Sequence, residues 1–184
     1  VYKRQGIHSR TDFDLKAHEE YSGKKLQYFD HEVNKSYVPY VVETSIGLDR
    51  MFLAVFSTAL QEEKLEDGSE RVVLKLPAVL APIKASVLPL VKKDGLPEIA
   101  REILDSLKFD FNVNYDEKDA IGRRYRRQDA IGTPFCITVD HETKENDTVT
   151  IRHRDSMEQK RVKISEIRSL ISEEVSVGNW LKKV

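Results

Sequence analysis

The feature that most restricts the fold is an alternation of strand-forming and helix-forming segments from residue 79 onward. Residues 79–85, 109–115, 133–140 and 148–154 carry the β-branched, aromatic or alternating patterns typical of strands. Residues 96–107 and 119–130 carry helical patterns, and a last helix is expected through Ile167, Leu170, Ile171 and Val175. Strands that alternate with helices predict an α/β domain with a mixed sheet flanked by helices.

Turn and cap residues support these boundaries. Pro97 suits the first turn of the helix over 96–107, Gly132 would end the helix over 119–130, and Ser165 can cap the last helix. Glu145-Asn146-Asp147 reads as a turn, so the strands on either side of it are expected to form a hairpin.

The N-terminal part is organised differently. Residues 37–42 predict a strand with Pro39 at an edge or a bulge, residues 47–62 predict a helix, and residues 71–76 predict a strand after a turn at Asp67-Gly68. The helix over 47–62 is apolar on nearly all sides, and such a helix belongs in the interior of a larger domain. Residues 1–46 cannot supply the layers around it, so we expect this chain, which begins with valine, to be a piece of a longer protein. We place the domain boundary between residues 75 and 76, giving domains over 1–75 and 76–184.

Composition and charge exclude several classes of protein. No apolar run approaches the roughly 18 residues of a membrane-spanning helix, and residues 1–10 do not resemble a signal peptide. Cys136 is the single cysteine, so an intrachain disulfide is excluded; its apolar neighbours predict a small buried side chain, which fits a reducing cytoplasm. The five histidines form no ligand-spaced pair, so we predict no metal site. A net charge of −1 excludes a globally basic nucleic-acid binder, so any such affinity must come from a local patch.

One basic patch lies between residues 118 and 128. Its basic residues are Lys118, Arg123, Arg124, Arg126 and Arg127, and its one acidic residue is Asp119. Arginines bind phosphates and stack on unpaired bases, so this patch is a candidate contact for nucleic acid. The alternative is that some of the arginines pair with Asp116, Glu117 or Asp129, and the spacing alone leaves both interpretations open.

A second candidate site begins at Glu43. A predicted strand runs through Glu43-Thr44-Ser45-Ile46 into Gly47, and the following helix carries Arg50 in its first turn. A helix start offers unpaired N–H groups to an anion, and Arg50 would add a fixed positive fork suited to phosphate. Glu43 and Ser45 would lie beside it, where a carboxylate and a hydroxyl suit a small ammonium-bearing ligand. A surface ion pair of Arg50 is the alternative that the spacing leaves open.

These residues resemble a known family. Gly47-Leu48-Asp49-Arg50 followed by an apolar helix resembles motif 3 of class II aminoacyl-tRNA synthetases, and Val41-Val42-Glu43-Thr44-Ser45 resembles the glycyl enzymes among them. The resemblance implies that the substrate glycine is lined by Glu43, Thr44, Ser45, Ile46 and Gly47. It also implies that ATP is contacted by Gly47, Leu48, Asp49 and the catalytic Arg50. Thr44 stands where the family commonly has proline.

A second stretch of the chain resembles the same family. Residues 6–15 resemble its segment between motifs 2 and 3, which makes Arg10 a candidate neighbour of ATP or of the substrate. An ion pair of Arg10 with Asp12 or Asp14 is the alternative. Lys3-Arg4-Gln5 departs from the glutamate and aliphatic residue that the family usually carries near the adenine.

The longest resemblance is to the family's anticodon-binding domain. It covers residues 121–140, 148–157 and 80–85, and it implies that Arg123, Arg124, Arg126 and Arg127 bind tRNA, with at least two of them on the RNA side. Residues 1–75 would then be the C-terminal part of an α+β catalytic domain with antiparallel strands, and residues 76–184 the anticodon-binding domain.

For the intact enzyme, the resemblance implies that glycine is activated with ATP and Mg²⁺ and attached to tRNA(Gly), usually by a cytoplasmic homodimer. Motifs 1 and 2 are absent from these residues, so the chain alone is expected to lack aminoacylation activity and to keep affinity for tRNA. One alternative is a non-catalytic tRNA-binding accessory module, against which the intact Glu43, Ser45 and Arg50 speak. Another is a class II enzyme of prolyl, threonyl or histidyl specificity.

Overall fold

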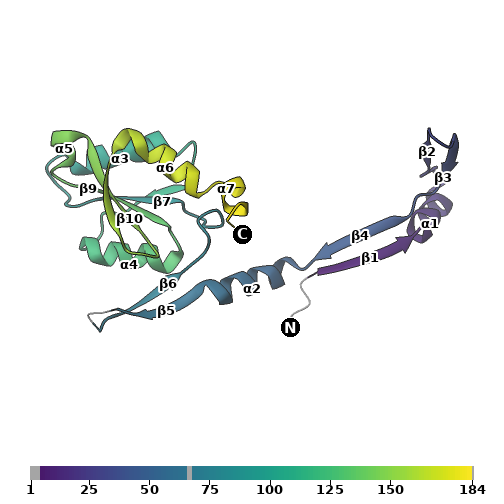
Figure 1. Cartoon of the computed structure of the whole chain (residues 1–184), viewed down its shortest axis with the longest axis horizontal. Helices are drawn as coiled ribbons and strands as arrows, with labels where there is room; N and C mark the ends of the chain where they lie inside the picture. Colours follow the sequence, from purple (N-terminus) through teal and green to yellow (C-terminus); the bar gives the residue numbers. More distant parts are fainter. Residues whose placement is uncertain (1–4, 66–67, 184) are drawn as a thin grey trace. The chain divides into compact units, whose positions relative to one another are not determined.

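The computed structural model describes residues 5–65 and 68–183, which form two compact units that divide between Ala54 and Val55. The larger C-terminal unit contains a five-stranded mixed sheet with the strand order β11-β10-β9-β7-β8 (Figure 1). Its strands are β7 (Ala85–Pro89), β8 (Val113–Tyr115), β9 (Phe135–Val139), β10 (Thr148–His153) and β11 (Gln159–Lys163). β7 pairs in parallel with β8 and β9, whereas β10 pairs antiparallel with β9 and β11. The predicted mixed α/β sheet is therefore confirmed.

Helices cover both faces of this sheet (Figure 1). α3 (Leu96–Leu107) and α6 (Ile167–Glu174) lie on one face, and α4 (Ile121–Ile131) lies on the other. Shorter elements complete the unit: α5 (Thr143–Asn146), the 3₁₀ helix η1 (Ile164–Glu166) and α7 (Val177–Leu181).

The two faces of the sheet differ in chemistry. Side chains alternate between faces along each strand, and one alternate set, with Val87, Ile137 and Val149 fully buried, joins Leu96, Ile103 and Ile171 of the covering helices in the main hydrophobic core. The other set carries polar groups in register across the strands. Ser86 of β7 lies between Asn114 of β8 and Cys136 of β9. Cys136 in turn lies opposite Arg152 of β10. This polar face is the one that α4 covers.

A hairpin of β5 (Leu60–Lys64) and β6 (Glu70–Leu74) also belongs to the C-terminal unit. β6 packs on α4, and Ala59, at the end of the preceding helix, clusters with Leu74 and Leu76. Gly132 ends α4 with φ 83°, a left-handed conformation that favours glycine. It also lies close to the hairpin, since a Cβ at that position would lie 3.1 Å from the carbonyl oxygen of Leu74. The compact units therefore divide earlier than residue 76, and the division at residues 75 and 76 stays a prediction about family domains.

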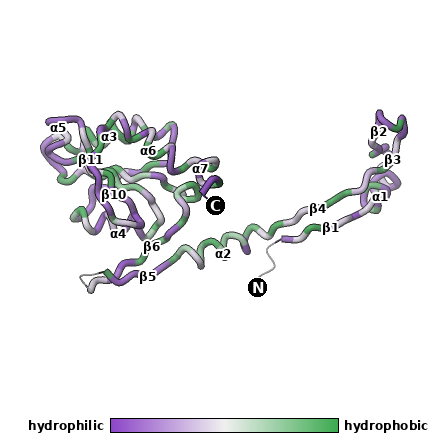
Figure 2. Tube along the Cα trace, viewed as in Figure 1, coloured by the Kyte–Doolittle hydropathy of each residue, from purple (hydrophilic) through white to green (hydrophobic). Residues whose placement is uncertain are grey.

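The N-terminal unit contains a two-stranded antiparallel ribbon of β1 (Gln5–Thr11) and β4 (Val41–Ile46). Between these strands lie α1 (Phe13–Ser22) and a small hairpin of β2 (Tyr28–Asp30) and β3 (Lys35–Tyr37), and α2 (Leu48–Ala59) follows β4. No residue from 5 to 54 is buried, although α2 is largely apolar along its length (Figure 2). Phe52 and Leu53 of α2 keep 67% and 59% of their surface exposed.

Several predicted elements were confirmed with small shifts of their ends. The helix over 96–107 has the predicted bounds with Pro97 in its first turn, and Gly132 ends the helix that was predicted over 119–130. The strand over 133–140 is β9, and it pairs antiparallel with β10 as predicted, although α5 makes the connection. The strand over 71–76 is β6, and Asp67 of the predicted turn lies outside the described residues.

Other predictions of secondary structure were wrong. Residues 79–84 are not a strand, because β7 begins only at Ala85. The strand over 109–115 is reduced to its last three residues, since the chain at 108–111 closes α3 with bonds such as Phe111 N–H to the carbonyl of Leu107. The strand over 37–42 is interrupted around Pro39, which cannot donate to a ladder. The helix predicted over 47–62 ends at Ala59. Ser165, which was expected to cap the last helix, lies in the 3₁₀ helix η1 that precedes α6. The strand β11 was not predicted.

Among the described residues, no helix combines the length and the apolar character needed to cross a membrane.

Candidate functional site

The four arginines of α4 have different environments. Arg123 is exposed, and Arg126 and Arg127 are half-buried. Arg124 is buried at 3% exposure, and its guanidinium donates to the carbonyl oxygens of Pro89 and Asp119 at 2.5 and 2.9 Å. The guanidinium of Arg124 therefore holds α4 on the sheet. The contact of Arg124 with tRNA stays a prediction.

Arg127 is paired, as the alternative interpretation predicted. Its guanidinium donates to Asp116 Oδ2 at 2.7 Å and to Asp119 Oδ2 at 2.8 Å, and its side chain stays 41% exposed. Burial alone would raise the pKa of Asp116, but hydrogen bonds from the backbone of Lys118 and from Arg127 hold that pKa below its usual value. Arg127 thus closes the loop before α4 and keeps an exposed edge.

Arg126 has one unmet hydrogen-bonding group. Its Nη1 atom is buried and has no hydrogen-bond partner in the described part of the chain. An unsatisfied donor costs about 1–3 kcal/mol, so this nitrogen would gain from a water or from a rotation of the side chain that gives it an acceptor. Arg123, Arg126 and Arg127 are therefore the members of the predicted set that have an accessible edge or an open donor.

Further polar residues on the α4 face of the sheet were missed by the sequence analysis. The Tyr125 hydroxyl lies 2.7 Å from Thr138 Oγ1, and the guanidinium of Arg152 lies 4.8 Å from the centre of the Tyr125 ring. Near the strand ends, Arg161 donates to both carboxylate oxygens of Asp140 at 2.5 and 2.9 Å. This hydrogen bonding lowers the pKa of Asp140. Period-two alternation places Thr148, Thr150 and Arg152 on one face of β10, and that was the signal available in the sequence.

The second candidate site lies on the ribbon of β1 and β4. His8 lies opposite Glu43, and Gly6 lies opposite Ser45, so the side chains of His8, Glu43 and Ser45 share one face of the ribbon. Arg10 joins them, because its Nε donates to Glu43 Oε2 at 2.8 Å. The structure thus brings together Arg10, Glu43 and Ser45, and it places Thr44 and Ile46 on the opposite face.

Arg10 and Glu43 neutralise each other in this structure. The hydrogen bond and charge of Arg10 lower the pKa of Glu43, and both groups stay exposed. Of the ion pairs predicted for Arg10, the one with Asp14 is present at 4.0 Å, whereas Asp12 pairs with Lys16 at 2.6 Å. Glu43 is therefore held ionised beside Arg10.

α2 begins directly after Gly47. Met51 N–H bonds to the carbonyl of Gly47 at 2.9 Å, and the side chain of Arg50 folds back so that its Cδ lies 3.4 Å from where a Cβ on Gly47 would stand. The predicted strand–glycine–helix arrangement with Leu48, Asp49 and Arg50 in the first turn is present. Whether glycine or ATP occupies it stays a prediction.

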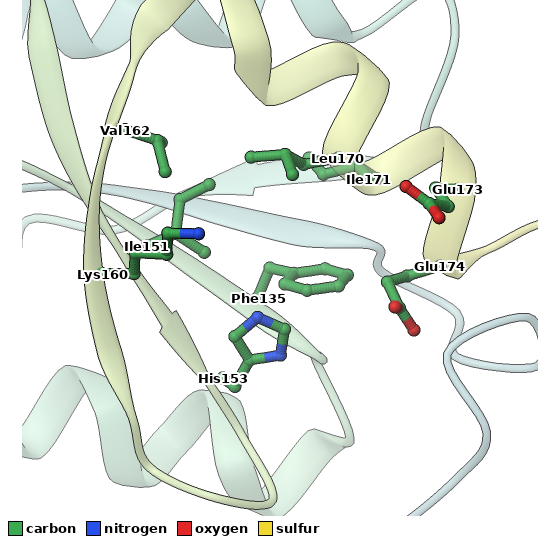
Figure 3. Close-up of a pocket in the computed structure, with 9 residues that line it drawn as sticks. All are labelled: Phe135, Ile151, His153, Lys160, Val162, Leu170, Ile171, Glu173 and Glu174. Atoms are coloured by element: carbon green, nitrogen blue, oxygen red, sulfur yellow. The ribbon is translucent and has the colours of Figure 1, made fainter.

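Two other features carry no site chemistry. A small apolar pocket of about 130 Å³ lies beside α6, where the rings of Phe135 and His153 meet edge to face and the carboxylates of Glu173 and Glu174 stand at the rim (Figure 3). Cys136 is buried as expected, and burial raises the pKa of its thiol to about 12, so it is not a nucleophile. No group of three potential metal ligands lies together in the described residues.

Comparison with known proteins shows which class of domain the C-terminal unit contains. Residues 84–174, which include α4 and the whole five-stranded sheet, match the family model described as "Anticodon binding domain". A solved structure titled as the RNA-binding domain of threonyl-tRNA synthetase from Cryptosporidium parvum Iowa II has a TM-score of 0.69 and covers 94% of this chain and 39% of its own. Its sequence identity is 18%, so this likeness shows the fold alone. The C-terminal unit therefore contains an anticodon-binding domain.

Curated relatives identify the family. The chain is 53% identical over 168 residues to the glycine–tRNA ligase of Chlorobaculum tepidum, 51% identical over 176 residues to that of Treponema denticola and 52% identical over 171 residues to that of Geobacillus kaustophilus. These matches cover 91–93% of this chain but only 36–39% of the relatives. The chain belongs to the glycine–tRNA ligase family, and it spans little more than a third of the length of the relatives that it matches.

Proposed function

We propose that this chain is the part of a glycine–tRNA ligase that binds the anticodon loop of tRNA(Gly), and that the outer side of α4 contacts the RNA. The observation that carries the proposal is that α4, with three arginines that keep an accessible edge or an open donor, lies inside the range that matches an anticodon-binding domain. Anticodon bases are unpaired, so guanidinium groups can both stack on them and bind the adjoining phosphates.

Arg123 and Arg126 are the main contacts in this proposal. Arg123 is exposed, and Arg126 is half-buried. The buried Nη1 of Arg126 has no partner in the described residues, and it would have to turn outward before a phosphate or base oxygen could accept from it. Arg127 forms ion pairs with Asp116 and Asp119, so its contribution to RNA binding is smaller. Specificity for tRNA(Gly) would then depend on base contacts that the arginines help to position.

The double variant Arg123→Met/Arg126→Met is expected to bind a glycine anticodon stem-loop at least 10-fold more weakly. Each phosphate contact to a single strand contributes about 0.7 to the slope of log K against log salt concentration, so loss of two contacts lowers that slope by about 1.4. Fluorescence anisotropy of a labelled stem-loop across a potassium chloride series measures both quantities.

A matched control separates a local contact from a general charge effect. Arg101→Met/Arg168→Met removes the same charge from α3 and α6, on the other face of the sheet, and should bind like the parent chain. Equal losses in both double variants would contradict an α4 interface. Equal affinity for tRNA(Gly) and for the same tRNA with a changed anticodon would contradict anticodon reading.

We further propose that the ribbon segment serves the ligase activity of the whole enzyme. Glu43, Ser45 and Gly47 would contact glycine, with the ionised Glu43 accepting from its ammonium group, and Arg50 would contact the phosphates of ATP. Arg10, which is hydrogen-bonded to Glu43 in this structure, would be a neighbour of one of these ligands. Mg²⁺ would enter with ATP, and no ligand to it is assigned to this chain. The whole ligase is proposed to be a cytoplasmic homodimer.

The chain by itself is not expected to attach glycine to tRNA, because the proposed site needs residues from the remaining two thirds of such a ligase. The purified chain, glycine, ATP, Mg²⁺ and tRNA(Gly) should yield no glycyl-tRNA above the level of a boiled sample. Measurable turnover would contradict the expectation that the chain needs the rest of the ligase to attach glycine to tRNA.

A further inference from the structure

A buried ionic cluster joins the β5–β6 hairpin to α4. Asp129 of α4 is fully buried, and its carboxylate accepts from Arg152 at 2.8 and 3.0 Å and from Arg71 Nη1 at 3.1 Å. The side chain of Arg71, which comes from β6, is 1% exposed. The three partners are separated by 58 and 23 residues in the sequence, so the cluster exists only in the folded unit.

Arg71 contacts β5, α4 and the residue that follows β10 at the same time. Its Nε donates to Glu63 Oε2 on β5 at 2.6 Å, and its Nη1 donates to the carbonyl oxygen of Arg154 at 2.8 Å as well as to Asp129. Only a planar guanidinium can supply these donors from one side chain. Arg71 therefore fixes the distance between the hairpin, α4 and the end of β10.

The cluster extends from Asp129 toward the residues that were missed on the polar face. Arg152, held by both oxygens of Asp129, lies against the ring of Tyr125, whose hydroxyl meets Thr138. Tyr125 stands between Arg124 and Arg126 in α4. A displacement of Asp129 would thus pass through Arg152 and Tyr125 to the part of α4 that carries the proposed RNA contacts.

Stability alone gives little reason for such a cluster. Buried ion pairs are costly to desolvate and can often be replaced by apolar residues without loss, whereas they do fix a unique arrangement of the elements that share them. The packing of β6 on α4, with Leu74 beside Gly132, already attaches the hairpin. The directional donors of Arg71 add orientation to that attachment.

We propose that Arg71 is a positioning residue for RNA binding: acting through Asp129 and Arg152, it sets the orientation of α4 from the β5–β6 hairpin. The inference rests on the proposed function of α4. Arg71 itself is buried and touches no RNA, so its loss should change affinity without removing a phosphate contact.

The test compares Arg71→Met and Arg71→Lys with the parent chain by the same anisotropy assay and by hydrogen–deuterium exchange. Arg71→Met keeps the apolar stem and leaves Asp129 paired with Arg152. It is expected to weaken stem-loop binding about 5- to 10-fold with an unchanged salt slope, and to speed exchange of α4 amides. Arg71→Lys keeps the charge but not the fork, and should behave like Arg71→Met.

Controls guard against a purely structural effect. Arg168→Met removes an exposed arginine of α6 that pairs with Asp110 at 2.9 Å, and should leave affinity and α4 exchange unchanged. Glu63→Gln weakens the hydrogen bond at the other end of Arg71 and leaves Asp129 unchanged. It should weaken stem-loop binding and speed α4 exchange to a smaller extent than Arg71→Met, and it replaces Arg71→Met in the test if that variant is poorly folded. All binding is measured well below each variant's melting temperature.

Three results would overturn the inference: folded Arg71 variants that bind like the parent chain, a salt slope that falls by about 0.7 as for a lost phosphate contact, or full rescue by lysine. A parent chain that does not bind the stem-loop would refute the proposed function instead. In that case, faster α4 exchange in Arg71→Met still supports the positioning role of Arg71, and unchanged exchange removes it as well.

Discussion

Replacing Asp129 with alanine is expected to destabilise the C-terminal unit by about 3–5 kcal/mol, the usual cost of removing one partner from a buried ion pair. Asp129 is fully buried and is shared by Arg71 and Arg152, whose side chains are 1% and 6% exposed. Without the carboxylate, two guanidinium groups remain in the interior with little water to solvate them. Urea unfolding followed by circular dichroism measures the change in the free energy of unfolding.

The matched control for this variant is Asp105→Ala. Asp105 pairs with Lys108 at 2.6 Å on the surface of α3, where its side chain is 63% exposed, and exposed pairs contribute at most about 1 kcal/mol. A loss below 1 kcal/mol for Asp129→Ala would show that water or a rearranged side chain compensates the two arginines, and would contradict the predicted cost of leaving them without the carboxylate.

Replacing Arg50 with methionine in a full-length ligase that carries this sequence is expected to lower aminoacylation about 10²- to 10³-fold, the usual effect of losing one preorganised donor to developing charge. The proposal places Arg50 at the phosphates of ATP, in the first turn of α2 where helix N–H groups also point. The loss should appear in ATP–pyrophosphate exchange as well as in tRNA charging, because both depend on adenylate formation.

Two comparisons make the Arg50 experiment decisive. Arg168→Met in the same ligase should retain full activity, and binding of tRNA by Arg50→Met should equal that of the parent enzyme. If Arg50→Met lowered only tRNA affinity and left pyrophosphate exchange intact, the assignment of Arg50 to ATP would be wrong.

The sequence predicted the fold class and the segments with strong local patterns. Residues 96–107 form a helix with the predicted bounds, because their apolar residues repeat at helical spacing and Pro97 favours a first turn. Residues 79–85 were wrongly predicted to be a strand, since an apolar run between prolines looks like a strand when its pairing partners are unknown. β7 starts at Ala85 because that residue pairs with both Val113 and Phe135.

The candidate sites were predicted only in part, for a similar reason. Residue spacing located the arginine-rich helix, but it did not show that Arg124 turns toward the carbonyl of Pro89 while Arg123 faces outward. The link between Arg71 and Asp129 joins residues 58 positions apart, and no local pattern contains it. Arg10 and Glu43 were each named as candidates, but their hydrogen bond depends on the register of β1 against β4.

The position of the β5–β6 hairpin has a practical consequence for anyone who wishes to excise the C-terminal unit. A cut at residue 76 would follow the expected family boundary, yet it would discard Arg71 and Glu63 and leave an internal aspartate short of one counter-charge. A fragment starting at Val55 retains the hairpin and the last turn of α2, including Ala59, whose carbonyl accepts from Lys75 N–H at 2.7 Å. Truncation at Val55 is therefore the sounder choice for crystallisation or NMR.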